Sequence, residues 1–136
     1  MATKLLKMVV LAAVSDGEVQ PNELEAINRI RQSHPVLRQV SDNECQAAIA
    51  DIYNKISAGM EAKHILEQIG SEYSSEEKNV AYALAVEICY SDFSIKNEEL
   101  HFLTDIEKQW KIPKEVSEPI KFSANLRFSI QTKHIF

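Results

Sequence analysis

Carboxylate side chains recur in the same pattern at two places in the chain, and they are the residues best suited to chemistry. Asp16 and Glu23 are seven positions apart, and Asp92 and Glu99 repeat that spacing 76 residues later. A Ser precedes each Asp and a Leu follows each Glu. Hard divalent cations such as Ca²⁺ and Mg²⁺ prefer oxygen ligands of this kind. The four acids are therefore candidate ligands of one divalent cation that both stretches would share.

The same four acids also have an interpretation that needs no cation. Glu23 and Glu99 fall in the first turn of expected helices, where the helix dipole favours negative charge. Asp16 and Asp92 follow the ends of expected helices, where the dipole disfavours it, and each could accept backbone N–H groups of its own turn. Helix capping and cation binding therefore both stay open at this point.

The stretch from Asp16 to Glu23 matches the second half of the calcium loop of an EF-hand. The first half does not match, because Ala12 and Val14 stand where ligands are needed. In the second copy Phe93 replaces the glycine of the turn. We therefore do not expect an ordinary EF-hand. In a site shared by both stretches, four carboxylates would repel one another unless they were protonated or neutralised by a cation.

Other reactive side chains show no comparable pattern. The cysteines, Cys45 and Cys89, form no CxxC motif, and both are expected to be buried thiols inside helices. No nucleophile elbow or phosphate loop is present. A hydrolase with paired carboxylates would need a cleft, and no sequence pattern here indicates one. We therefore expect a protein without enzymatic activity. The histidines lack the spacing of a zinc site and stand at positions 34, 64, 101 and 134.

Helical periodicity accounts for most of the 136 residues, which contain only 3 Gly and 4 Pro. Capping boxes are expected at Ser41 with Glu44 and at Ser74 with Glu77. Gly59 and Gly70 would end the helices that precede them. The expected helices cover about 3–14, 21–33, 41–59, 61–69, 74–90, 97–110 and, as a short last helix ended by Pro119, 113–119.

Two of these helices are expected at the centre of the molecule. Residues 3–14 are apolar on nearly every side, and residues 74–90 carry apolar pairs over several turns. The apolar stripe of 21–33 recurs 76 positions later, and Trp110 closes the second stripe as a core residue. The sequence therefore predicts an all-α, single-domain bundle of about six to seven helices over residues 1–118. Its two similar halves would be about 3–33 and 78–111, with 41–70 between them.

Residues 119–136 differ from this pattern. Apolar and polar residues alternate from Phe122 to Ile130, a period typical of a strand. No acidic residue follows Glu118, whereas three basic residues do. We expect a basic, extended C-terminal tail. It would either drape on the body or pair with a second copy to form a homodimer.

The formal net charge is −5, and the part before the basic tail is more acidic still. Such a surface argues against nucleic acid, whose phosphates require a basic face, and suits a cation or a basic protein partner. The apolar run at residues 8–14 is too short to span a membrane and does not read as a signal peptide. A cytoplasmic protein is the expectation.

The chain resembles the TerB-like family, the bacterial tellurite-resistance TerB proteins and related domains, one of them in a membrane-anchored DnaJ-like co-chaperone. The resemblance covers roughly residues 3–115. It is carried by Asp-Gly-x-Val-x-Pro-x-Glu-Leu at 16–24 and by Asp-x-x-Ile…Glu-Leu at 92–100. It implies an all-α bundle of two halves with the acidic positions Asp16, Glu23, Asp92 and Glu99. It also implies a role in tellurite or metal stress, through divalent-cation binding and protein contacts. Phe93 departs from the family's usual glycine.

Overall fold

The computed structural model describes the backbone of residues 2–14, 21–90 and 97–133. Side chains are described for these residues except 2, 21–23, 26, 97–99 and 128–133. Within this part the chain forms α-helices, one short 3-10 helix and no strand, which confirms the predicted all-α bundle. The helices are α1 (Ala2–Ala13), α2 (Pro21–Ser33), η1 (Leu37–Gln39), α3 (Asp42–Ser57), α4 (Ala62–Gly70), α5 (Ser75–Tyr90), α6 (Asn97–Gln109) and α7 (Lys114–Lys133).

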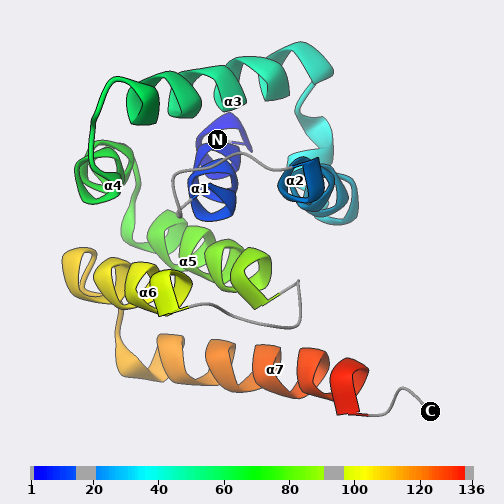
Figure 1. The fold of residues 1–136 in the computed structure, drawn as a ribbon. Helices are drawn as coiled ribbons and strands as arrows, with labels where there is room; N and C mark the ends of the chain where they lie inside the picture. Colours follow the sequence, from blue (N-terminus) through cyan, green and yellow to red (C-terminus); the bar gives the residue numbers. More distant parts are fainter. Residues whose placement is uncertain (1, 15–20, 91–96, 134–136) are drawn as a thin grey trace.

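Helix α1 lies at the centre of the upper part of the bundle, with α3 above it, α2 and α4 on its two sides and α5 below (Figure 1). Seven of its positions from Leu5 to Ala12 are buried, and so is Val14 just after the helix. A helix that is apolar all round is stable only when its whole circumference is covered, and four neighbouring helices cover this one. The predicted central place of this segment is confirmed.

Helix α5 is the second central element. It packs against α1 on one side and against α7 on the other, and α6 runs beside it (Figure 1). Its last three turns are buried nearly all round, including Tyr82 at 0% exposure. The hydroxyl of Tyr82 donates a 2.6 Å hydrogen bond to Glu107 Oε2 on α6. Burial, and then this carboxylate, raise the pKa of Tyr82 far above its ordinary value.

Both predicted capping boxes are present. The Glu44 amide donates to Ser41 Oγ at 3.2 Å, while the Ser41 amide donates to Glu44 Oε1 at 3.4 Å. At the start of α5 the same exchange joins Ser74 and Glu77, with distances of 3.2 and 2.9 Å. The Ser74 amide lowers the pKa of Glu77, because it hydrogen-bonds the charged carboxylate. Each box satisfies two amides that a helix start would otherwise leave unpaired.

Helices α3 and α6 end with the same backbone motif. After α3, Gly59 has a φ of +91°, and the Met60 amide donates to the Lys55 carbonyl at 3.0 Å. After α6, Lys111 has a φ of +53°, and the Ile112 amide donates back over the same interval, to Glu107, at 3.0 Å. Both are Schellman motifs, which pair the orphan carbonyls of a helix end. Gly59 was predicted to end the helix that precedes it. At position 111, by contrast, a lysine gives no indication of the left-handed backbone conformation.

Gly70, the last residue of α4, is required for its small size. A Cβ on Gly70 would lie 2.3 Å from Nε1 of Trp110, which also donates a 3.3 Å hydrogen bond to the Leu66 carbonyl. Trp110 meets the ring of Tyr73 edge to face, with 5.5 Å between ring centroids. The predicted core place of Trp110 is confirmed, and the close approach joins the end of α6 to the end of α4.

The prediction of an extended C-terminal tail is wrong for the described residues. Residues 114–133 form the helix α7, which continues through Pro119. Its inner positions, Ser117 and Ala124, are buried against α5, and Lys121 forms a 3.1 Å ion pair with Glu107. Burial of this inner face outweighs both the helix-breaking tendency of proline and the strand-like alternation. Residues 134–136 lie outside the described part.

Candidate functional site

The four predicted ligands lie at the margin of what the structure describes. Asp16 and Asp92 fall in 15–20 and 91–96, outside the described residues. Glu23 and Glu99 lie in the first turns of α2 and α6, where the backbone is described and their side chains are not. The prediction that the four carboxylates converge therefore stays a prediction. The helices that carry them are described, and they fix where the chain enters and leaves each acidic stretch.

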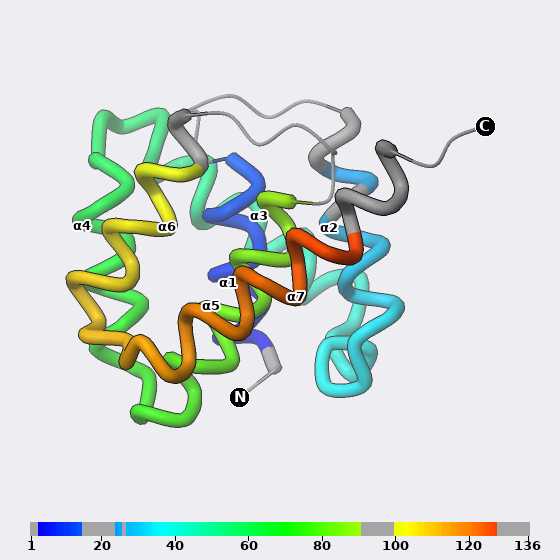
Figure 2. The backbone as a smooth tube through the Cα atoms, turned by 90° about the horizontal axis from the view of Figure 1, so that it is seen from below, coloured from blue at the N-terminus to red at the C-terminus, as the bar shows by residue number. Residues whose placement is uncertain are grey.

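The ends of α1 and α5 lie on the same side of the molecule (Figure 2). The two helices pack against each other, and both run toward the upper edge of that view. The described beginnings of α2 and α6 lie at opposite ends of that edge (Figure 2). Each acidic stretch therefore leaves and re-enters the helical body on this one side.

Positions that lie 76 residues apart on α2 and α6 have similar burial. Leu24 on α2 and Leu100 on α6 begin the two apolar stripes and are 37% and 42% exposed. One turn later, Ile27 and Leu103 are 1% and 2% exposed. Internal duplication predicts this agreement, because related helices would meet the body in the same orientation. Each apolar stripe is therefore less covered at the turn next to its acidic stretch than one turn later.

The described residues offer no alternative metal centre. In 2–14, 21–90 and 97–133, no group of three or more His, Cys, Asp or Glu side chains is placed to hold an ion. His34, His64 and His101 lie on different elements, after α2, on α4 and on α6. Acidic side chains in this part are instead used in ion pairs, such as Asp42 with Arg31 at 2.9 Å.

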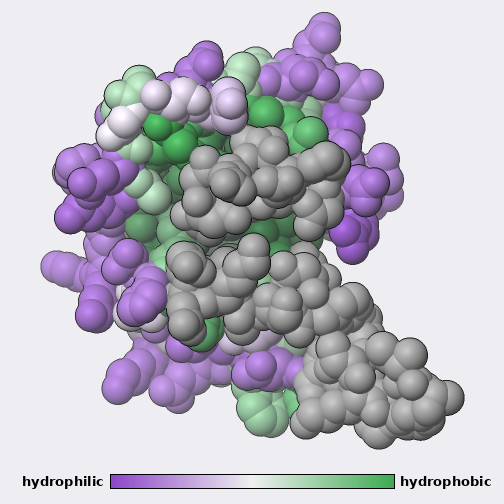
Figure 3. Space-filling view, viewed as in Figure 1, coloured by the Kyte–Doolittle hydropathy of each residue, from purple (hydrophilic) through white to green (hydrophobic). Residues whose placement is uncertain are grey.

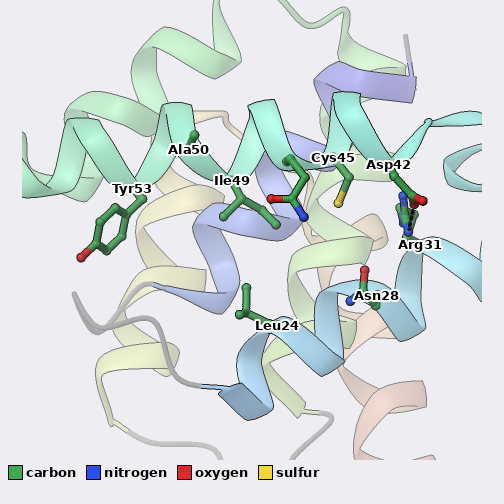
Figure 4. Close-up of a pocket in the computed structure, with 9 residues that line it drawn as sticks. Leu24, Asn28, Arg31, Asp42, Cys45, Ile49, Ala50 and Tyr53 are labelled. Atoms are coloured by element: carbon green, nitrogen blue, oxygen red, sulfur yellow. Dashed lines mark hydrogen bonds and ion pairs between the residues drawn. The ribbon is translucent and has the colours of Figure 1, made fainter.

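A groove of about 660 Å³ runs between α2 and α3 (Figure 4). Leu24 from α2 points toward Ile49 and Cys45 from α3 across this groove, as Figure 4 shows. The Arg31–Asp42 ion pair stands at one end and the exposed ring of Tyr53 at the other. The walls are mainly apolar, so the groove suits an apolar side chain or a small amphipathic molecule.

The thiol of Cys45, which lines this groove, is expected to be a poor nucleophile. Cys45 is buried, and burial raises its pKa, which the nearby Asp42 raises further while Arg31 lowers it. A thiol whose pKa is raised stays protonated near neutral pH, and only the thiolate is a good nucleophile. Cys89 is buried as well, and neither cysteine forms a disulfide. The expectation of buried thiols is confirmed.

The groove is the feature that the sequence prediction missed. Leu24 starts the apolar stripe of α2, yet α3 leaves part of its side chain uncovered. Tyr53 follows the inward-facing Ile52 by one position, so helical geometry turns it off the buried face. An aromatic residue at such an outward position is the one sequence signal that could have pointed to the groove.

None of the described helices is long and apolar enough to cross a membrane. Searches among curated proteins and among solved structures return no match. A family model, described as tellurite resistance protein TerB, matches residues 2–121. This match spans α1 to α6 and the start of α7, including both acidic stretches. The chain therefore belongs to the TerB family.

Proposed function

We propose that this TerB protein binds one divalent cation between its two acidic stretches, with Asp16, Glu23, Asp92 and Glu99 as ligands. The single observation that carries the proposal is the packing of α1 against α5, with both helix ends on one side of the molecule (Figure 2). Two short connections that start from neighbouring helix ends can bring their carboxylates to one ion. Calcium accepts six to eight oxygens, so neither stretch would suffice alone.

The proposed role is binding and not catalysis, in the cytoplasm, as part of a response to tellurite or metal stress. The family supports the stress role, and two buried cysteines without a disulfide suit a reducing compartment. A cation held between the halves would also tie α1–α2 to α5–α6, because its ligands come from both. Metal occupancy would then control the surface presented to partner proteins.

Calorimetric titration with Ca²⁺, Mg²⁺, Mn²⁺ and Zn²⁺ tests the cation site. We expect saturable binding to the wild type and none to Asp16→Asn/Asp92→Asn. The matched control is Glu76→Gln/Glu115→Gln, which removes two exposed first-turn charges from α5 and α7 and should bind like the wild type. No binding to the wild type, or equal binding to the Asn variant, would refute the site.

Single variants separate the two halves of the proposed site. We expect Asp16→Asn to weaken affinity more than Asp92→Asn, by at least about 10-fold. The reason is that Phe93 occupies the place of the glycine that the first stretch has at position 17. Growth of producing cells on tellurite should follow the same order if occupancy matters for resistance.

A second candidate function, which needs no metal, rests on the groove between α2 and α3. The groove exposes Leu24 and Tyr53 on a chain of net charge −5. Its fitting occupant is a basic segment of another protein with apolar anchors. A photo-crosslinker at position 53 should then capture the same protein with and without chelator, and Leu24→Ser should abolish capture. Capture that needs the divalent cation would favour the first candidate.

A further inference from the structure

Helix α7 contacts the rest of the bundle through a narrow inner face of small side chains. Among its described residues, only Ser117 and Ala124 are buried, while Val116 and Ile120 are partly covered. Helix α5, by comparison, buries leucine, isoleucine, valine and tyrosine side chains. Hydrophobic stabilisation grows with the apolar area that is removed from water. The apolar contact of α7 with the bundle is therefore small for a helix of 20 residues.

The larger apolar side chains among the described residues of α7 lie outside this contact. Phe122 and Leu126 are 65% and 51% exposed. In Figure 1, α7 forms one edge of the molecule, with α5 and α6 on its inner side only, and Figure 3 shows hydrophobic side chains among hydrophilic ones at that edge. These two side chains therefore add little apolar burial between α7 and its neighbours.

Two ion pairs join α7 to the helices beside it. Lys121 Nζ lies 3.1 Å from Glu107 Oε2 on α6, and Arg127 Nη1 lies 2.9 Å from Glu87 Oε2 on α5. The four side chains are between 22% and 51% exposed. Glu107 Oε2 also accepts the 2.6 Å hydrogen bond from Tyr82, which holds this carboxylate in place. In both pairs the acid belongs to the α1–α6 body and the base belongs to α7.

Ion pairs with this degree of exposure depend on ionic strength. Salt screens them, because the Debye length falls from about 10 Å at 0.1 M to about 3 Å at 1 M. Helix α7 contains more basic than acidic residues, whereas the whole chain has a net charge of −5. Salt should therefore weaken the attraction between α7 and the acidic body, and at the same time relieve repulsion within that body. The two effects on stability have opposite signs.

Two further observations separate α7 from the body. Pro119 has no amide to donate, so α7 lacks one backbone hydrogen bond within two residues of Lys121. The TerB match ends at residue 121, so the later turns of α7, which include Arg127, lie outside the family model. Helices α1 to α6 lie entirely within that model. The body is therefore the shared part of the fold, and most of α7 is an addition to it.

We propose that α7 is a detachable helix, which leaves the body as one unit while α1–α6 stay folded. The ion pairs Lys121–Glu107 and Arg127–Glu87 control how often it leaves, so ionic strength regulates the release. Native proteins open in such cooperative units, and those with few buried apolar contacts open most readily. The proposal is independent of the cation site, because α7 carries none of its four ligands.

A groove between α2, α5 and α7 shows what the release would change. It has a volume of about 400 Å³, and its walls include Ile30 of α2, Leu84 of α5 and Ile120 of α7. Without α7 the groove loses one wall, and Leu84, which is 5% exposed in the closed form, becomes more accessible. Glu87 lines the same groove and would lose its ion pair with α7. Release therefore uncovers an apolar face of α5 that is bordered by negative charge.

Hydrogen exchange of the full chain in chelator, resolved by residue, tests this release. We expect the amides of residues 120–127 to share one opening reaction and to exchange at least about 10-fold faster than those of α1 and α5. Raising NaCl from about 0.05 M to about 1 M should speed them a further 3- to 10-fold, but should not speed the amides of α3. Exchange of α7 only with global unfolding, protection that falls steadily toward residue 133, or no acceleration by salt would each overturn the proposal.

A charge-neutral variant tests the two ion pairs. Glu87→Gln/Glu107→Gln removes both negative charges and keeps an oxygen that can accept from Tyr82. We expect about 3- to 10-fold faster exchange of α7 at low salt and loss of most of its salt dependence.

The matched control is Asp51→Asn, which removes the 3.8 Å ion pair between Lys7 of α1 and Asp51 of α3. It should leave the exchange of α7 unchanged. Equal effects of the control and the double variant, or full salt dependence in the double variant, would overturn the role of the ion pairs. The salt dependence of the wild type decides the release itself, even where a variant does not fold.

Discussion

Gly59 and Lys111 end their helices with the same backbone conformation, but the conformational free energy that it costs differs between the two residues. Only glycine adopts positive φ without a clash between Cβ and the following carbonyl, and that clash costs about 1–2 kcal/mol in other residues. A Cβ on Gly59 would meet no atom within 4 Å, so the conformational cost there is free of packing effects. Lys111 bears that cost in the native protein, and its neighbours hold it in place through the Ile112–Glu107 hydrogen bond.

Substitution at these two positions should change stability in opposite directions. Gly59→Ala should lower the free energy of unfolding by about 1 kcal/mol. Lys111→Gly should raise it by about 0.5 kcal/mol, because the relief of strain is partly offset by the greater conformational freedom of glycine in the unfolded chain. Urea denaturation followed by circular dichroism measures both. Lys111→Ala removes the charge but keeps the strain, so it should show no gain. A gain as large as that of the glycine variant would point to the charge instead.

At the scale of elements, α7 shows the limit of predicting secondary structure from local sequence patterns. The alternation from Phe122 to Ile130 suggested a strand, and Pro119 suggested a stop. The sequence of α7 also contains spacings of four, such as Ile120 with Ala124, that place apolar groups on one helical face. Contact with α5 selects the helix, and the sequence of α7 alone does not contain that contact. By contrast, α3 and α5 were predictable because their capping boxes are local.

Pro119 leaves a gap in the hydrogen bonding of α7, which a substitution should close. Proline has no amide to donate to the Glu115 carbonyl, and its ring crowds that carbonyl. Pro119→Ala should therefore raise the free energy of unfolding by about 1–3 kcal/mol. Thermal denaturation at low protein concentration checks this, and Ser123→Ala, one turn on at an exposed position, is the control. A lower melting temperature would mean that the helix needs the proline, for example to fix its start.

At the scale of the whole molecule, the bundle and its two central helices could be predicted from the sequence more completely than the geometry of a cation site. The apolar lengths of α1 and α5 dictate burial, and burial dictates their central place. The spacing of Asp16 and Glu23 names candidate ligands but sets no distance to Asp92 and Glu99. That distance depends on how the two halves pack, and such long-range geometry has no local signal. The groove beside Leu24 was not predicted from the sequence for the same reason.

A divalent cation that joins the halves should stabilise the whole fold. Binding to the native state alone adds about 2.7 kcal/mol at 100 times the dissociation constant, which for a chain of this size is about 10 °C in melting temperature. The net charge of −5 means that any salt also relieves some repulsion. The comparison is therefore with NaCl of equal ionic strength. An equal shift in both salts, or in Asp16→Asn/Asp92→Asn, would contradict a specific site.

The central place of α1 also has a consequence for how the protein is made. The ribosome synthesises α1 before any of the helices that cover it, and its main partner α5 ends at Tyr90. At 5–20 residues per second, the nearly all-apolar segment ending at Val14 waits roughly 4–15 seconds for that partner. During this time it is a hydrophobic nascent segment of the kind that chaperones bind. The helix that organises the finished bundle is thus the most vulnerable one while the chain is still growing.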